Sequence, residues 1–150
     1  MTDAERLVRA YYAAFDDADA EAFLALLTED VVHDISQGGR EVGKPAFRRF
    51  VAHMSHCYRE TITDLVVMTD ATGTRAAAEF TVHGSYTATD PGVPAGTAPA
   101  SGQSYTLPAG AFFTLRDGRV ARISNHYNLG DWIAQVNAGA KLTPAPAPGH

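Results

Sequence analysis

Asp34 is the residue in this sequence best placed to act as an acid or base, and His33 lies beside it. Both come near the end of the run Val31-Val32-His33-Asp34-Ile35, whose β-branched residues are typical of a short strand. In an apolar pocket the pKa of the Asp34 carboxyl rises, which suits it to remove a proton next to a carbonyl group. The alternative is that Asp34 ends the strand and caps the glycine-containing loop 36–39.

Tyr11 is the candidate hydrogen-bond donor for such a reaction. Apolar residues recur at helical spacing over residues 2–17, and Tyr11 is one of them. A tyrosine hydroxyl at the base of a pocket would stabilise the oxyanion that forms when a carbonyl compound loses a proton. The alternative is a core aromatic residue in the apolar stripe of this helix. Phe50 and Phe113 are predicted core residues that would also serve as walls of the pocket.

A polar stripe follows a predicted strand over residues 74–87, where Glu79, Thr81 and His83 share one face. At the rise of a strand, Glu79 and His83 lie about 13 Å apart, so they would bracket a ligand rather than contact each other. The alternative is a stripe that faces solvent or a partner subunit.

Two histidines, His53 and His56, lie in a predicted helix that begins near Pro45. Their spacing can place two side chains on one metal ion, but the sequence near them supplies no third ligand. Cys57 is the only cysteine, which excludes a disulfide within the chain and a thiolate metal cluster. We therefore expect surface histidines, no metal site and no cofactor.

Short-range signals predict the elements that must position these residues: three helices with one short strand among them, then four long strands and a final helix. Thr2-Asp3-Ala4-Glu5 has capping-box spacing, and Pro45 suits the first turn of the third helix. Asp117-Gly118 is a hairpin-turn signal, and Asp131 is expected to cap the final helix. The Pro- and Gly-rich segment 88–104 predicts a long loop, of a kind that is usually functional or mobile.

Length and charge limit the classes of protein to consider. The chain has 150 residues and a formal net charge of −5, which fits one domain and argues against nucleic acid or an anionic membrane as the main partner. No apolar run is long enough for a membrane span, and the first residues lack the pattern of a secretory signal. We expect a cytoplasmic protein with one domain over residues 1–139 and a disordered Pro/Ala tail over residues 140–150.

The order of elements predicts an α+β fold, and four stretches of sequence resemble one superfamily. They are RAYYAAFDDADAEAF, LTEDVVHD, VGKPAFRRF and FFTLRDGRVARISNHYN. In this order they resemble the nuclear transport factor two-like superfamily, and within it the SnoaL-like and ketosteroid-isomerase-related proteins. The resemblance, over residues 3–138, implies a cystatin-like α+β cone. In such a cone, a curved antiparallel or mixed sheet wraps around the N-terminal helices and leaves an apolar pocket. It also implies a homodimer through the outer face of the sheet.

The resemblance further implies roles for individual residues. Tyr11 matches a tyrosine that donates to the developing oxyanion in ketosteroid isomerases, and Asp34 is nearest to their general base, with an offset of one residue. Ala111 lies where those enzymes have a protonated aspartate and where SnoaL-type cyclases have a catalytic histidine. Asn125 matches an aspartate on the last strand of the cyclases, so Asn125 and Tyr127 are expected to face the pocket. Half of the isomerase oxyanion hole is therefore missing.

We expect an enzyme of isomerase or polyketide-cyclase type that removes a proton next to the carbonyl of a small hydrophobic molecule, with little steroid isomerase activity. Asp34 and Tyr11 are the predicted catalytic residues. The predicted substrate-binding residues are His33, Phe50, Glu79, His83, Phe113, Asn125 and Tyr127. The alternatives are a non-catalytic protein that binds a small molecule and a dimeric interaction module with a filled core.

Overall fold

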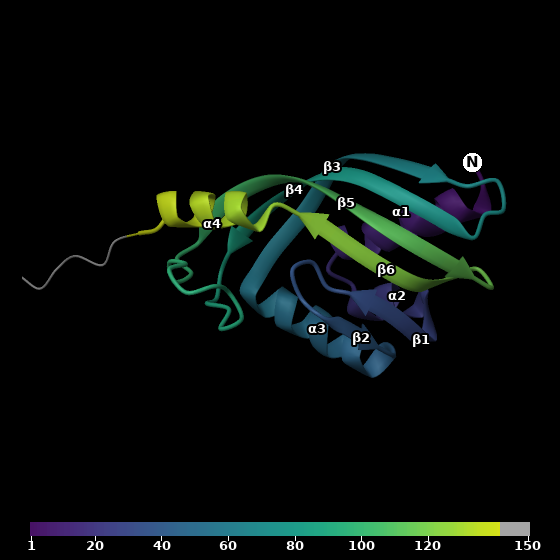
Figure 1. The fold of residues 1–150 in the computed structure, drawn as a ribbon, viewed down its shortest axis with the longest axis horizontal. Coiled ribbons are helices and arrows are strands. Elements are labelled where there is room, and N and C mark those ends of the chain that lie inside the picture. Colours follow the sequence, from purple (N-terminus) through teal and green to yellow (C-terminus); the bar gives the residue numbers. More distant parts are fainter. Residues whose placement is uncertain (142–150) are drawn as a thin grey trace, which may run out of the picture.

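The computed structural model describes residues 1–141, in which helices pack against one curved sheet (Figure 1). In chain order the elements are α1 (Asp3–Asp16), α2 (Ala20–Ala25), β1 (Leu27–Asp34), β2 (Arg40–Val42), α3 (Lys44–Cys57), β3 (Tyr58–Thr69), β4 (Arg75–Tyr86), β5 (Gln103–Arg116), β6 (Arg119–Tyr127) and α4 (Leu129–Ala138). Residues 142–150, most of the predicted tail, lie outside the described residues.

The sheet has six strands in the order β2-β1-β6-β5-β4-β3. Neighbouring strands are antiparallel except β1 and β6, which run parallel. The sheet curves over α1, while α4 and the long loop after β4 lie at the opposite end of the molecule (Figure 1). The predicted α+β fold with a curved mixed sheet around the N-terminal helices is confirmed. We call the face that packs against α1 the inner face and the opposite one the outer face.

Several element boundaries lie where local signals predict them. The Thr2 hydroxyl accepts a hydrogen bond from the Glu5 amide at 3.1 Å and caps α1. In the β5–β6 turn Asp117 and Gly118 have φ angles of 53° and 72°, which an Asp-Gly pair tolerates. The cap of α4 differs from the prediction, because Asn128 rather than Asp131 is the N-cap. The side chain of Asn128 accepts the Asp131 amide at 3.0 Å.

Two apolar clusters fill the inner face. The larger one joins α1 and α2 to the middle of the sheet and contains Val8, Phe80 and Phe113. The smaller one lies under α4 and consists of Tyr86, Tyr105, Leu107, Trp132 and Val136. Within residues 1–141 no helix is long and apolar enough to cross a membrane.

Candidate functional site

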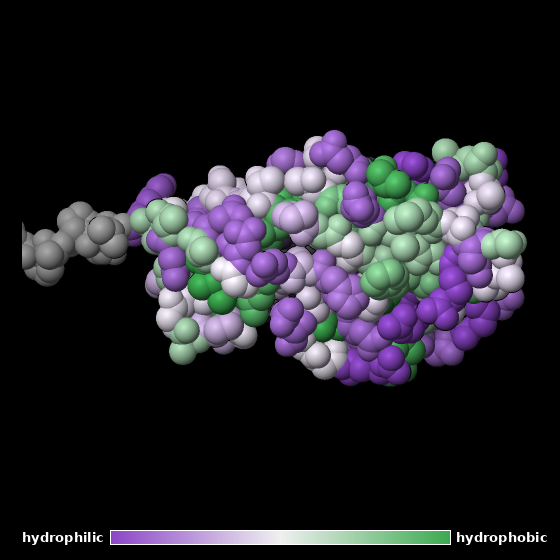
Figure 2. Space-filling model, turned by 45° about the horizontal axis from the view of Figure 1, so that its top comes forward, coloured by the Kyte–Doolittle hydropathy of each residue, from purple (hydrophilic) through white to green (hydrophobic). Residues whose placement is uncertain are grey.

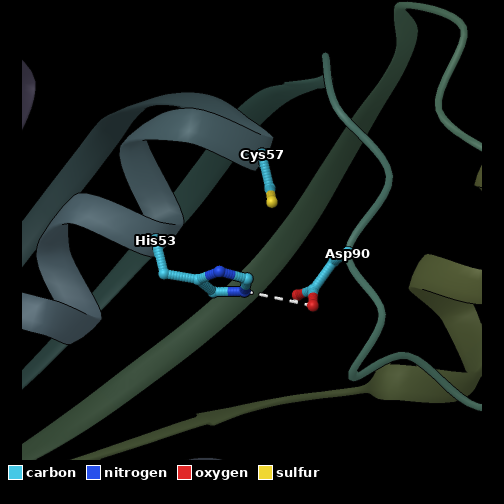
Figure 3. A group of neighbouring side chains, drawn as sticks. All are labelled: His53, Cys57 and Asp90. Carbon is cyan, nitrogen blue, oxygen red and sulfur yellow. Dashed lines mark ion pairs between the residues drawn. The ribbon is translucent and has the colours of Figure 1, made fainter.

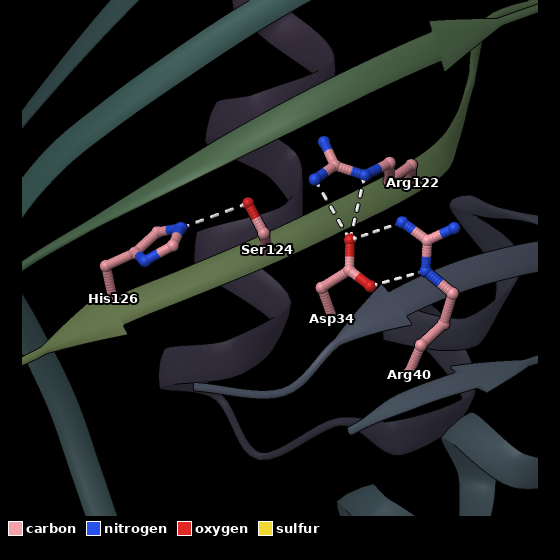
Figure 4. Close-up of polar contacts among 5 residues, drawn as sticks. All are labelled: Asp34, Arg40, Arg122, Ser124 and His126. Carbon is pink, nitrogen blue, oxygen red and sulfur yellow. Dashed lines mark hydrogen bonds and ion pairs between the residues drawn. The ribbon is translucent and has the colours of Figure 1, made fainter. Parts of the chain in front are cut away.

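Asp34 lies on the outer face, where two arginines bind its carboxylate (Figure 4). Arg40 Nε donates to Oδ1 at 2.6 Å, and Arg122 Nε donates to Oδ2 at 2.9 Å. The hydrogen bond from Arg40 is the main cause that holds the pKa of Asp34 below its ordinary value, and Arg122 adds to it against the effect of partial burial. The expected rise of this pKa in an apolar pocket is therefore wrong.

His33 points the other way, because successive side chains of a strand face opposite sides. It is 2% exposed and packs on Phe47 and Phe50, with ring centroids 4.8 and 4.4 Å away. Burial lowers its pKa to about 4, while the charge of Asp34 acts in the opposite direction. The imidazole is therefore neutral near pH 7. Phe50, expected as a wall around Asp34, contacts His33 and borders a surface groove of about 440 Å³.

Tyr11 is a core residue of α1. It is 4% exposed and packs against Tyr12, Phe23 and Phe113. Burial first, and then the neighbouring Tyr12, raise the pKa of its hydroxyl well above the ordinary value. Phe113 is fully buried beside it. Tyr11 and Asp34 thus lie on opposite sides of the sheet, and the structure does not bring them together in one site.

The polar stripe of β4 lies on the outer face. Ala78 and Phe80 are buried in the core, so the alternate residues Glu79 and His83 are directed outward. His83 Nε2 lies 2.8 Å from the Thr63 hydroxyl. Glu79 borders an open surface groove of about 610 Å³. Of the two alternatives that the sequence leaves open, these placements fit a polar stripe that faces solvent or a partner subunit, and not a pair that brackets a ligand inside the cone.

The end of β6 carries Asn125 and Tyr127 on the same face as buried Ile123. Asn125 pairs with Ala111 of β5, which is 1% exposed. Tyr127 is 36% exposed, and its pKa is raised mainly by burial and further by the charges of Glu60 and Asp90. Tyr127 is therefore near two carboxylates that the sequence analysis did not single out.

Ser124 and His126 lie on the outer face of β6 near Asp34, with 3.2 Å between the serine hydroxyl and His126 Nε2 (Figure 4). A nucleophile with its base would need a third group that orients the histidine. The Asp34 carboxylate does not fill that role, because it is bound by Arg40 and Arg122.

The carboxyl of Glu60 and the hydroxyl of Tyr105 form a close pair on the inner face. The Tyr105 hydroxyl donates to Glu60 Oε2 at 2.6 Å. Burial raises the pKa of Glu60, against the opposing effect of this hydrogen bond. The two residues lie on β3 and β5, on either side of Gly84 in β4. A Cβ atom at Gly84 would lie 2.3 Å from Cζ of Tyr105, so the glycine gives the ring room to reach Glu60.

A second carboxylate, Asp90, comes from the long loop after β4. Tyr58 donates its hydroxyl to Asp90 Oδ2 at 2.7 Å, and the Asp90 amide donates to the Tyr86 hydroxyl at 2.8 Å. Burial would raise the pKa of Asp90, but hydrogen bonds from Tyr58, the Gly92 amide and His53 together hold it below its ordinary value. Asp90 thus fastens the first part of the loop to the inner face, and Asn137 of α4 holds the loop further along through Gly96 and Ala98.

Four aromatic rings connect these carboxylates, and we call them the aromatic cluster: Tyr58, Tyr86, Tyr105 and Trp132. Tyr58 stacks on Tyr86 with 5.3 Å between ring centroids, and both rings make edge-to-face contacts with Trp132. For Tyr58 and Tyr105, burial is the main cause of a strongly raised pKa, so both hydroxyls stay protonated and act as donors.

Glu60 and Tyr105 are not among the residues predicted from the sequence. One local signal exists: β3 begins at Tyr58, and in a strand from that residue Tyr58 and Glu60 share a face with the apolar Ile62, which packs against the core. The contact between Glu60 and Tyr105 carries no such signal, because the two residues are 45 positions apart.

The cone of sheet and helices is the fold of the nuclear transport factor two-like superfamily. Within it, residues 8–123 match the family model of the SnoaL-like domain. The chain belongs to the SnoaL-like family, as the sequence resemblance predicted. No curated protein matches this chain.

Solved structures add two close matches and a distant one. A candidate polyketide cyclase from Pseudomonas putida KT2440 is 58% identical, with a TM-score of 0.84 over 91% of this chain and 98% of the other. A second from Xanthomonas campestris pv. campestris is 51% identical, with a TM-score of 0.83 over 89% and 96%. An epoxide hydrolase of the LEH-like type from M. tuberculosis is 17% identical, with a TM-score of 0.70 over 91% of each chain, and shows the fold alone.

Proposed function

We propose that this protein is an enzyme of isomerase or cyclase type that moves a proton next to the carbonyl of a small hydrophobic molecule. The observation that carries the proposal is the Glu60–Tyr105 pair, 2.6 Å apart on the inner face under α4. Glu60 removes the proton from the carbon next to the carbonyl and later returns it, and a tyrosine hydroxyl donates to the enolate oxygen.

Three features support this assignment. Burial raises the pKa of Glu60, which strengthens it as a base near neutral pH. Tyr58 and Tyr105 already donate their hydroxyl protons to Asp90 and Glu60. Tyr127 keeps its proton because its pKa is raised, and it is the donor that we propose for the oxyanion. The 58% identity to a candidate polyketide cyclase agrees with this reaction class, because cyclisation of the aldol type also proceeds through an enolate.

The assignment made from sequence, with Asp34 as base and Tyr11 as donor, is the competing version of the same proposal. A carboxylate bound by two guanidinium groups is a weaker base than Glu60, and Tyr11 lies on the other side of the sheet. We therefore expect Asp34→Asn to leave proton transfer unchanged.

We further propose that the protein is a cytoplasmic homodimer. Its steroid isomerase activity should be far below that of a dedicated isomerase, because Ala111 supplies no hydrogen-bond donor to the oxyanion.

The test is hydrogen–deuterium exchange at the carbon next to the carbonyl of aryl alkyl ketones, followed by NMR in D₂O. We expect exchange above the buffer rate in the wild type and a loss of at least about 100-fold in Glu60→Gln. Tyr105→Phe should move the acidic limb of the pH–rate profile to higher pH, because it removes the hydrogen bond that lowers the pKa of Glu60. Glu79→Gln, on the outer face, is the matched control and should exchange like the wild type. Equal rates in Glu60→Gln and the wild type would remove Glu60 as the base.

A further inference from the structure

Three potential metal ligands from two segments meet in the structure (Figure 3). One of them, Asp90, accepts a hydrogen bond from Tyr58 of the aromatic cluster. His53 and Cys57 come from the last turns of α3 at the i, i+4 spacing that places side chains on one side of a helix. Asp90 comes from the loop after β4. One ligand atom from each residue lies within 4.8 Å of the other two. His53 and Cys57 thus have the third ligand that the sequence near them does not supply, and it comes from 33 positions beyond Cys57.

From this geometry we infer that His53, Cys57 and Asp90 bind a divalent transition metal ion, with zinc as the expected ion. Thiolate, imidazole and carboxylate are all zinc ligands, and three protein ligands leave a fourth position for water or a substrate. In a tetrahedral zinc site with bonds of about 2.0 Å, nitrogen and oxygen ligands lie about 3.3 Å apart. His53 Nε2 and Asp90 Oδ1 are 3.1 Å apart, close to that spacing.

The groups around the three residues fix them in place as the outer shell of a metal site does. Tyr58 holds Asp90 Oδ2 at 2.7 Å, and the Gly92 amide donates to Oδ1 at 2.8 Å. Cys57 is 1% exposed, so its sulfur is shielded from solvent. The side chain of His53 is 44% exposed and borders the groove of about 440 Å³, which gives an ion a route to the site. Binding of the metal ion would release the thiol proton of Cys57, because the thiolate is the form that binds a metal.

The experiment is titration of the purified protein with Co²⁺ and Zn²⁺. We expect Co²⁺ to give the near-ultraviolet charge-transfer band of a cobalt–thiolate bond and the visible bands of a tetrahedral ion, and Zn²⁺ to displace it. Loss of an outer-shell partner costs about 10–100-fold in metal affinity, so Tyr58→Phe should fall in that range and loss of a direct ligand should cost at least about 100-fold.

Matched variants separate this site from nonspecific binding. Cys57→Ser should abolish the charge-transfer band, while His53→Gln and Asp90→Asn should weaken binding and keep part of it. His56→Gln, a histidine of the same helix outside the trio, should bind like the wild type. If Cys57→Ser does not fold, comparison of His53→Gln with His56→Gln decides the question. Absence of the band in the wild type, or equal affinities in those two variants, would overturn the inference. The result does not depend on the Glu60–Tyr105 proposal, because no turnover is measured.

Discussion

At the scale of residues, His33 and Asp34 are neighbours in β1 with opposite surroundings. His33 is buried against Phe47 and Phe50, whereas Asp34 is bound by Arg40 and Arg122 on the outer face. The sequence predicts a strand here, but a slip of one residue would exchange the two side chains between faces. The facing is set by pairing with β6, where Asp34 lies opposite Ser124. No local signal in the sequence carries that pairing, so the sequence alone does not predict which of the two side chains faces inward.

The arginine contacts predict a structural role for Asp34. Its folded pKa is lowered, so its contribution to stability is present above the unfolded value of about 4 and is lost as the pH falls through the folded pKa. Asp34→Asn should lower the free energy of unfolding by about 1 kcal/mol at pH 7, since the partly exposed pairs are screened by solvent. The deficit should shrink below about pH 4.

Urea unfolding at pH 7 and at pH 3 measures this difference. Asp17→Asn, at the exposed end of α1, is the control and should show a smaller change at both pH values. A deficit in Asp34→Asn that is the same at both pH values would show that the ion pairs do not stabilise the fold.

At the scale of elements, Gly84 of β4 lets Tyr105 of β5 reach Glu60 of β3. Gly84→Ala should push the Tyr105 ring aside, because the added Cβ would lie 2.3 Å from Cζ. We expect a loss of about 1–3 kcal/mol in stability from overpacking. A double-mutant cycle in urea tests the cause: Tyr105→Phe should cost about 1 kcal/mol in the wild type and almost nothing beside Gly84→Ala. Gly39→Ala, where an added Cβ meets nothing within 4 Å, is the control. Additive costs would contradict this explanation.

Elements with strong local signals were predictable, and those that depend on pairing were not. The Thr2 cap, Pro45 in the first turn of α3 and the Asp117-Gly118 turn all match the structure. β2 was missed because it has three residues and exists through pairing with β1. The composition of segment 88–104 predicts a loop, but the attachment of this loop to the inner face through Asp90 is a tertiary contact that composition does not predict.

At the scale of the whole molecule, the inner face divides into an apolar end and an end where carboxylates lie among the aromatic rings. Under α1 and α2 it is filled by aromatic rings around Tyr11 and Phe113, where the sequence analysis expected a pocket. Under α4 it carries Glu60 and Asp90 among the aromatic cluster. The superfamily resemblance predicts the fold correctly, whereas matching residues to its enzymes points to Tyr11 at the apolar end and to Asp34 on the outer face. The pair that we propose for acid–base chemistry, Glu60 and Tyr105, lies on β3 and β5 instead.

The outer face carries an exposed apolar row that suits the interface of the homodimer we propose. Met68, Ala77 and Phe112 lie on adjacent positions of β3, β4 and β5, and Met68 and Phe112 are 51% and 52% exposed. A broad hydrophobic area covers the sheet here, with hydrophilic residues along its edge (Figure 2). In a two-fold dimer the interface buries each of these side chains and its copy in the other subunit. Full burial of a large apolar side chain contributes about 1.5–3 kcal/mol.

Light scattering at micromolar concentration should therefore give a dimer for the wild type and a monomer for Phe112→Asp, because the substitution places two carboxylates in one apolar interface. Val42→Asp is the matched control, since Val42 is 60% exposed on the edge strand β2, away from the row. It should remain a dimer, and both variants should keep the far-ultraviolet circular dichroism of the wild type. A monomeric wild type would refute the assignment. If Val42→Asp dissociates the dimer and Phe112→Asp does not, the interface lies at the β2 edge. In a two-fold dimer a substitution inside the interface places the new charge there twice, whereas one outside it adds no charge to the contact.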